Sequence, residues 1–417
     1  MNPFELKPMN INDTIIDWNT MYEKPYNKYE VDPYTKARII LANGAEVEAT
    51  FFSHQFSRNC HNNDIRRQLA LVRRIEQQQQ KRIQCLKPLD ETILETTISY
   101  EQLAVDLTAN FAQNEINVNV KNALDFALLE DFDHLYRYAN LLEYETGICP
   151  EKLVGCYTEI MPGRPTISEH RYPYDTVNNY IDFKDVSQIT KLHASIITAA
   201  EQQTMNFYMN VCGFYTTDIG RQLYQEIGMI EEEHVTQYGS LLDPTYTWLE
   251  NLLNHEYSEC YLYYSSFIEE TNPRIKCIWE QCFQQEVSHL HIACDLLKKY
   301  ENKEWQQIIP DGTFPNLISL HQNIDYVREA LKNTVNYTSI HEDYMQVCQI
   351  PSNSNFFFYQ QKVNCNVSCV PSHIVIDKYI DKSCKDYRYE TALNPILELQ
   401  NRESDNTCVG RQPLCNI

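Results

Sequence analysis

Carboxylates and histidines recur at matched spacings between residues 185 and 301, within apolar-periodic runs of helical length. In each copy, a Glu is followed 30 residues later by a second Glu, and a His comes three residues after that. Residues three apart share one face of a helix, so such a Glu and His can bind one metal ion. The pattern therefore predicts helices that carry ligands toward a common core. The two copies are Glu201, Glu231 and His234, and Glu256, Glu286 and His289.

A third copy lies upstream, on a helical hairpin predicted over residues 98–146. Glu101 is followed 30 residues later by Asp131, and His134 comes three residues after that. Glu130, four residues before His134, is an alternative acid on the same helix. These residues form a second set of metal-ligand candidates.

The rest of the chain is also predicted to be mainly α-helical, because 417 residues contain only 10 glycines. Residues 36–55 are the exception: we expect a small β-hairpin there, because Asn43-Gly44 is a strong turn signal between apolar and β-branched residues. Asn272 before Pro273 is typical of a helix start. The expected helices cover 63–86, 98–113, 117–146, 185–213, 216–241, 245–270, 274–301 and 315–333. The expected domains are 1–95, with an arm, the hairpin and an Arg/Gln-rich helix; 96–305, a helical bundle; and 306–417, a helix and an irregular tail.

The positions of the acids along these helices favour a metal site. At a rise of ~1.5 Å per residue, counted from the predicted turns, the candidates on the four helices of 185–301 fall in one layer of the bundle. Buried carboxylates are costly unless they are paired or bind a cation. The layer contains Glu201, Glu231, His234, Glu256, Glu259, Glu286 and His289.

The spacing of these residues resembles that of the ferritin-like di-metal carboxylate superfamily, in which two helices give one Glu each and two give Glu-x-x-His. Glu256-x-x-Glu259 is similar to the pair of acids on the third helix of rubrerythrin. The resemblance implies an antiparallel bundle of about six long helices and two iron or manganese ions. It implies bridging by Glu231 and Glu286, terminal ligation by Glu201 and Glu256, and one ion each for His234 and His289.

Two features depart from that family. The connection at 241–245 is short where ferritin-like bundles have a long crossover, and no Cys-x-x-Cys pair supplies a rubredoxin-type iron site. A second pairing, of 98–146 with 185–241 through the long link 147–184, has the expected crossover. We prefer the 185–301 set because its two halves have matching spacing. The ligands of the second pairing would be Glu101, Glu130 or Asp131, His134, Glu201, Glu231 and His234.

The resemblance implies an oxidoreductase that acts on O₂ or peroxide, with an external electron donor because the rubredoxin-type cysteines are absent. The alternatives are a non-enzymatic metal-binding or storage protein, and a structural protein without metal. A net charge of −22 disfavours nucleic-acid binding. The sequence leaves open whether the protein forms a homo-oligomer.

The segments outside the bundle add three expectations. We predict no membrane span, because no apolar run reaches about 18 residues. We predict a cytoplasmic protein with reduced thiols, because the start has no secretory signal. In the tail, N and S ligands suit a structural zinc ion. That zinc candidate comprises Cys365, Cys369, His373 and Cys384.

Overall fold

The structure, a computed structural model, describes residues 1–384. It is mainly helical, as predicted, with one small two-stranded antiparallel sheet. The chain forms two compact units whose segments are interleaved, whereas three consecutive domains were expected. The first unit comprises residues 1–91, 181–203 and 242–320, and the second comprises 92–180, 204–241 and, of the described residues, 321–384.

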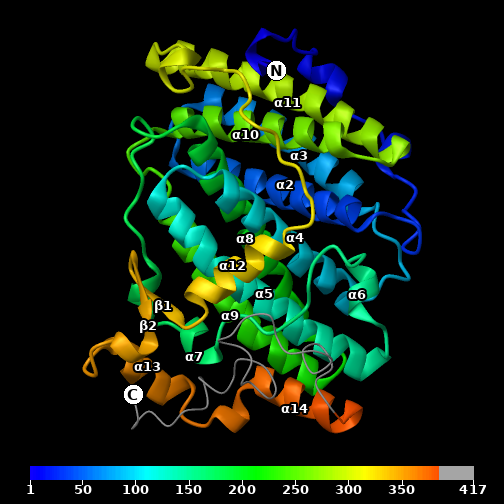
Figure 1. Cartoon of the computed structure of the whole chain (residues 1–417). Coiled ribbons are helices and arrows are strands. Elements are labelled where there is room, and N and C mark those ends of the chain that lie inside the picture. Colours follow the sequence, from blue (N-terminus) through cyan, green and yellow to red (C-terminus); the bar gives the residue numbers. More distant parts are fainter. Residues whose placement is uncertain (385–417) are drawn as a thin grey trace. The chain divides into compact units, whose positions relative to one another are not determined.

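Two helical hairpins form the first unit, α2–α3 in blue and α10–α11 in yellow-green in Figure 1. Helix α2 contacts α10, and α3 contacts α11, so the four helices enclose one core. The helix bounds are α1 (Trp18–Met21), α2 (Pro33–Asn59), α3 (Asn63–Gln84), α10 (Trp248–Glu269) and α11 (Pro273–Glu301). Helix α8 (Gln188–Phe214) begins in this unit and ends in the other.

The predicted β-hairpin at 36–55 is wrong, because these residues lie inside helix α2. Asp32 caps that helix and Pro33 occupies its first turn, a favourable helix start. Gly44 has a packing role: a Cβ at this position would lie 3.1 Å from Cβ of Gln203. Close helix approach, and not a turn, therefore accounts for the glycine.

The second unit is built around α5, which contacts α4, α9, α12 and α14. Its hydrophobic core includes Leu128, Leu135 and Leu142 of α5, all fully buried. The helix predicted at 315–333 begins later, at Ile324. The bounds are α4 (Ile93–Asn114), α5 (Val118–Thr146), α6 (Pro150–Leu153), α7 (Thr166–Glu169), α9 (Asp218–Gly239), α12 (Ile324–Thr334), β1 (Tyr337–Ile340), β2 (Asp343–Gln346), α13 (Asn355–Val363) and α14 (Pro371–Ser383).

Side-chain caps fix where several of these helices start. Thr92 at α4 and Thr247 at α10 each form a capping box with a Glu three residues later. Asn272 caps α11, as predicted, and accepts a hydrogen bond from the backbone N–H of Arg274 at 3.1 Å. These starts set the height at which each helix presents its acids.

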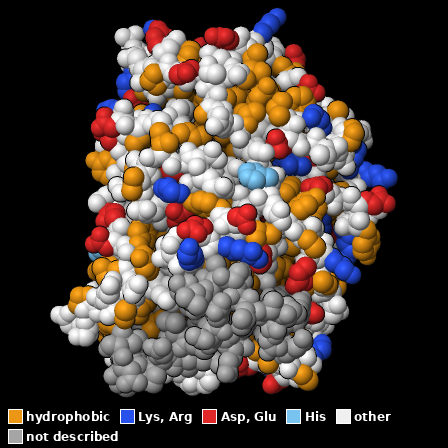
Figure 2. All heavy atoms as spheres, viewed as in Figure 1, with side chains coloured by type: hydrophobic (Ala, Val, Ile, Leu, Met, Phe, Trp, Pro, Cys, Tyr) orange, Lys and Arg blue, Asp and Glu red, His pale blue; other side chains and the backbone are white. Residues whose placement is uncertain are grey.

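The surface carries charges of both signs. On the face in view in Figure 2, acidic and basic side chains are interspersed among apolar ones. Among the described residues, no helix is both long enough and apolar enough to cross a membrane.

Candidate metal centres

Four helical hairpins carry the same spacing of polar residues, one more than the sequence analysis recognised. The additional hairpin is α2–α3, where Glu46 is followed 30 residues later by Glu76 and, three residues after that, by Gln79. It was missed because 36–55 was interpreted as a β-hairpin and because a glutamine stands where the other copies have histidine. The spacing itself was the signal that could have identified it.

The second unit brings together the candidates from α4, α5 and α9. Ligand atoms of four buried side chains all lie within 4.8 Å of one another. Glu231 lies between two imidazoles: its Oε1 is 3.0 Å from Nδ1 of His134, and its Oε2 is 3.4 Å from Nδ1 of His234. The four side chains within 4.8 Å are Glu101, Asp131, His134 and Glu231. We call them, with His234, the second-unit centre.

Glu130 and Asp131 were alternatives in the sequence, and they have different positions in the fold. Oδ1 of Asp131 lies 3.3 Å from Nδ1 of His234. Oε2 of Glu130 lies 2.8 Å from the other ring nitrogen, Nε2, and Oε1 of Glu130 pairs with Arg171. With a proton on Nε2, His234 donates to Glu130 and turns Nδ1 toward Asp131. Glu130 therefore orients a ligand candidate, and Asp131 is itself a ligand candidate.

A buried guanidinium group pairs with a carboxylate beside this centre. Burial opposes ionisation of Glu130, but Arg171 and His234 outweigh it and hold the pKa of that carboxyl below its usual range. Burial, then the neighbouring His234, keeps the pKa of His134 well below its ordinary value. His134 is therefore a neutral imidazole, the form that binds metals.

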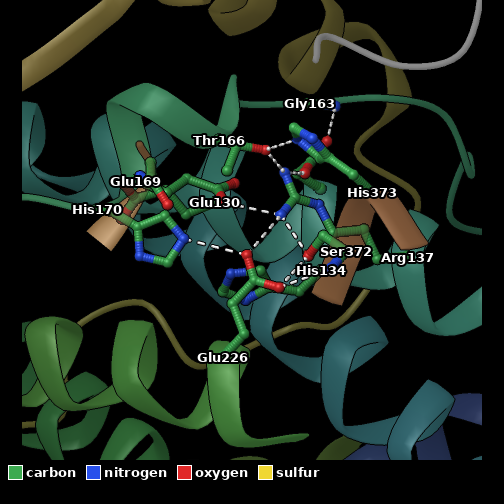
Figure 3. Close-up of polar contacts among 12 residues, drawn as sticks. Glu130, His134, Arg137, Gly163, Thr166, Glu169, His170, Glu226, Ser372 and His373 are labelled. Carbon is green, nitrogen blue, oxygen red and sulfur yellow. Dashed lines mark hydrogen bonds and ion pairs between the residues drawn. The ribbon is translucent and has the colours of Figure 1, made fainter. Parts of the chain in front are cut away.

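A second group of ion pairs lies beside the centre, as Figure 3 shows. Arg137, from α5, lies 3.2 Å from Oε2 of Glu169 and donates to Oγ of Ser372 at 2.7 Å. Glu226 lies 3.1 Å from Nε2 of His170. Burial opposes ionisation of Glu226, but His170 and Arg137 outweigh it and lower its pKa to about 2. These contacts give the second unit a buried cationic shell next to its acids.

The first unit brings together candidates from α3, α10 and α11. Three overlapping groups of buried or half-buried side chains have ligand atoms within 4.8 Å of one another. Nδ1 of His289 lies 2.9 Å from Oε2 of Glu286 and 3.8 Å from Oε2 of Glu256. The groups comprise Glu76, His255 and Glu259; Glu76, Glu256 and His289; and Glu256, Glu259 and Glu286. We call these six residues, with Glu46, the first-unit centre.

The hydrogen-bonding partners in this centre are mostly neutral. Gln79 donates from Nε2 to Oε1 of Glu286 at 2.6 Å, and the hydroxyl of Tyr263 donates to Glu46. Oε2 of Glu259, a residue that is 2% exposed, lies 3.6 Å from Nε2 of His255. Among the described residues, one buried oxygen each of Glu46 and Glu76 has no hydrogen-bond partner.

Burial and mutual repulsion control the protonation of these acids. Burial, followed by the charges of neighbouring glutamates, raises the pKa of Glu46, Glu256 and Glu259 well above its usual range. Burial raises the pKa of Glu76 to about 7. Unpartnered oxygens on buried acids are the arrangement that a bound cation would satisfy, so the donor set fits a metal ion.

The structure divides the seven preferred candidates between the two units. Glu231 and His234 belong to the second unit, together with the residues of the 98–146 hairpin. Glu201 is buried on α8, where the helix passes from one unit to the other, and its part in a centre stays a prediction. The candidates found in the first unit are Glu256, Glu259, Glu286 and His289.

The zinc candidate in the tail gains no support. Cys365, Cys369 and Cys384 are exposed. Nε2 of His373 is fully buried and lies 2.9 Å from Oγ1 of Thr166, beside Arg137. Within residues 1–384, none of the groups at metal-ligand distances contains these four side chains.

Small hollows reach the first-unit centre from outside. One of about 300 Å³ is lined by Glu76, Glu256 and His289 together with apolar side chains that include Phe52 and Leu252. The space in it that water can enter is about 10 Å³, which is room for about one water molecule.

Comparisons with known proteins do not extend this description. No protein-family model matches the chain, and neither a curated protein nor a solved structure matches it. The functional inference therefore rests on the two centres.

Proposed function

We propose that the second-unit centre binds two iron or manganese ions in a ferritin-like helical bundle and serves as an oxidoreductase site for O₂ or peroxide. The observation that carries the proposal is the position of Glu231, with one oxygen 3.0 Å from Nδ1 of His134 and the other 3.4 Å from Nδ1 of His234. A carboxylate between two imidazoles suits the bridging of two ions. Mixed carboxylate and imidazole ligands suit iron and manganese, which supply redox chemistry when bound.

The protein's own residues have distinct tasks in this proposal. Asp131, Glu231 and the two histidines provide ligands, and Glu101 is a terminal ligand whose carboxylate is held by the hydroxyl of Tyr208. The centre lies in the interior, where water cannot compete for the ligand atoms. Glu201 is proposed as the remaining ligand because it has the same spacing on α8 as Glu101 has on α4.

Glu130 and Arg171 would position the centre without touching a metal ion. Glu130 fixes the ring of His234, and Arg171 fixes Glu130. Such partners of metal-ligating histidines set the ring orientation and the tautomer.

The first-unit centre favours a second function, the holding of metal ions without turnover. Its acids outnumber its imidazoles, and Gln79 stands where the other hairpins have histidine. Oxygen-rich ligand sets suit hard cations such as Mn²⁺.

Paired variants test these assignments. The wild-type chain, purified without added metal and then loaded anaerobically with Fe(II), should bind metal at both centres by elemental analysis and anomalous diffraction. Asp131→Ala should empty the second-unit centre and abolish peroxide or O₂ turnover, and Glu286→Ala should lower only the metal content of the first. Glu201→Ala should lower the metal content of the second.

Asp125→Ala is the control, because Asp125 lies on α5 outside the cluster, where it accepts a hydrogen bond from Tyr326. A wild-type protein that stays metal-free after loading would contradict the proposal. Undiminished turnover in Asp131→Ala would contradict the assignment of chemistry to the second unit.

A further inference from the structure

The Arg- and Gln-rich helix α3 carries an exposed row of residues that repeats with the spacing of a coiled-coil seam. Six side chains follow one another at alternating intervals of three and four residues, and all are exposed or half-buried. These intervals keep a row on one face of a helix, and such a row is the face along which two helices pack. The row, which we call the α3 seam, comprises Arg67, Ala70, Arg74, Gln77, Lys81 and Gln84.

The charged residues of the α3 seam are all cations, although the whole chain has a net charge of −22. Arg67, Arg74 and Lys81 recur every seven residues, which places them about 10.5 Å apart along the helix axis and nearly in one line. Among the described residues, none of the three forms an ion pair, and Lys81 donates to the side-chain oxygen of Gln80. Positive charge is thus exposed here without a carboxylate of the protein to pair with it.

The two acids of α3 lie away from the seam. Oδ2 of Asp64 is 2.7 Å from Nζ of Lys299, on α11. Glu76 is buried and belongs to the first-unit centre. Exposed side chains outside such contacts contribute little to stability, so the fold itself does not account for the row of cations.

The N-terminal arm lies beside the seam and presents aromatic side chains. Gln78, next to the seam on α3, donates from Nε2 to the backbone oxygen of Ile16 at 2.7 Å and accepts from its backbone N–H at 3.0 Å. Trp18 and Tyr22 follow on the arm, and they are 83% and 66% exposed. Trp, Tyr and Arg are enriched where protein interfaces gain most of their binding free energy. The arm therefore adds apolar contact area next to the cations.

We propose that the α3 seam is the docking surface for an acidic α-helix of a partner protein, whose carboxylates recur every seven residues. A helix with this repeat has its charges at the same interval of about 10.5 Å, so that each carboxylate meets one cation. Ala70 and Gln77 lie between the cations and are uncharged, which gives room to the partner side chains between the carboxylates. Trp18 covers the edge of the bound helix. The inference does not depend on the function proposed above.

The dimensions and surroundings of the seam favour a helix over other anionic partners. Its cations span about 21 Å in a single line, and the arm beside it also carries the exposed carboxylates of Asp13 and Asp17. A bilayer or a long nucleic acid would extend past the seam onto a chain of strongly negative net charge, whereas a short helix does not. A second copy of this chain cannot pair through the same face, because cations would meet cations.

The experiment uses the full chain and a fluorescein-labelled synthetic helix of three heptads, with Glu at every seventh position, Leu three residues after each Glu, and Ala and Gln elsewhere. Fluorescence anisotropy should show saturable binding that weakens as the salt concentration rises. Arg74→Glu, at the centre of the seam, should weaken binding by about tenfold or more, as should a peptide with Gln in place of Glu. Trp18→Ala should weaken it several-fold.

Lys332→Glu is the matched control, because Lys332 is exposed in the second unit and the substitution makes the same change in net charge. It should bind the peptide as the wild type does, and circular dichroism should show that every variant is folded. Absence of saturable binding to the wild type, equal binding of the Glu and Gln peptides, or undiminished binding in Arg74→Glu would overturn the proposal. Tighter binding to phosphatidylserine vesicles or to a thymidine oligonucleotide, lost in Arg74→Glu, would also overturn it, because the seam would then serve another class of partner.

Discussion

The two candidate centres have ligands at the same spacing but differ in what neutralises their carboxylates. In the second unit, Arg171 pairs with Glu130 and Glu233, and Arg137 pairs with Glu169. These guanidinium groups are fully buried. Arg171 and His234 outweigh burial and hold the pKa of Glu130 below its usual range, and His170 and Arg137 do the same for Glu226, whereas burial raises the pKa of Glu169 and of Glu233.

The first-unit centre has mostly neutral partners and no buried guanidinium group among its ligand candidates. Gln79 and Tyr263 donate hydrogen bonds to its acids. The cations that lower the pKa of Glu76 are His289 and then Arg73, which is half-buried and donates to Ser53. Burial raises the pKa values of Glu46, Glu76, Glu256 and Glu259, whereas His289 outweighs burial and lowers the pKa of Glu286. The second unit therefore provides fixed guanidinium charge beside its centre, whereas most acids of the first-unit centre keep their protons until a metal ion replaces these. Equal spacing does not imply equal electrostatics.

The largest expected effect is the loss of stability when a buried guanidinium group of the second unit is removed. Arg171→Ala leaves Glu130 and Glu233 buried without their cation, which should lower the free energy of unfolding by about 3–5 kcal/mol. Arg73→Ala, the matched change in the first unit, should cost about 1 kcal/mol or less because Arg73 is partly in solvent. Urea denaturation of both chelated variants measures the difference. Equal losses would mean that the two centres do not differ in this respect.

The next largest expected effect is the dependence of stability on the protonation of the first-unit acids. In the metal-free protein, folded Glu76 keeps its proton up to about pH 7, whereas the unfolded chain releases it near 4.5. The folded state therefore binds more protons in that range, and stability falls as pH rises. Glu76 alone should contribute about 3 kcal/mol below the unfolded pKa, and this contribution is lost as pH rises through about 7. Hydrogen exchange of first-unit amides at about pH 5 and about pH 8 should reveal the loss.

Glu76→Gln keeps the neutral form at every pH and should remove the part of that dependence that Glu76 contributes, whereas Glu46, Glu256 and Glu259 keep theirs. Bound metal should also remove it, because metal ligation requires the ionised carboxylate. If the metal-free first unit were equally stable at both pH values, the conclusion that its acids are protonated would be contradicted.

The smallest expected effect is a change in metal affinity at Gln79, the position where the repeated spacing has a glutamine in place of histidine. Gln79→His would give α3 an imidazole at the place of His134 on α5, and should raise the affinity of the first-unit centre for Fe(II) by about tenfold, or about 1.4 kcal/mol. Gln78→His is the control, because Gln78 donates to the backbone of Ile16 on another face of the helix. Competition with a coloured chelator measures both. An unchanged or lower affinity in Gln79→His would show that the glutamine is not a substitute for a ligand.

The sequence predicted the helices of the two centres well, because apolar periodicity and capping residues are local signals. It misplaced 36–55 because the turn propensity of Asn43-Gly44 is also local, whereas the helix is capped by Asp32 and is packed closely against Gln203 at Gly44. Tertiary contact outweighed propensity there. The ligand candidates on three of the four hairpins were recognisable from their spacing, whereas Glu46 and Glu76 on the fourth were missed.

The pairing of the hairpins could not be read from the sequence. All four have the same spacing, so height within a bundle does not distinguish one partner from another. The buried cations were missed for a similar reason: Arg171 lies in the long link 147–184, and only the fold brings it to Glu130. The choice between Glu130 and Asp131 likewise depended on the direction of each side chain.

The interleaving of the two units affects the order in which the protein can assemble on the ribosome. The hairpin pairs are nested: α4–α5 and the end of α8 with α9 belong to the second unit, and they are synthesised between α2–α3 and α10–α11 of the first. Helix α3 therefore emerges with Glu76 long before its partner α11 exists. During that interval Glu46 and Glu76 lack Tyr263 and His289, the partners that α10 and α11 later supply. The inner helices are complete at Gly239, whereas the outer ones wait until Glu301, so a nascent chain that stalls between these points would carry an unfinished first unit.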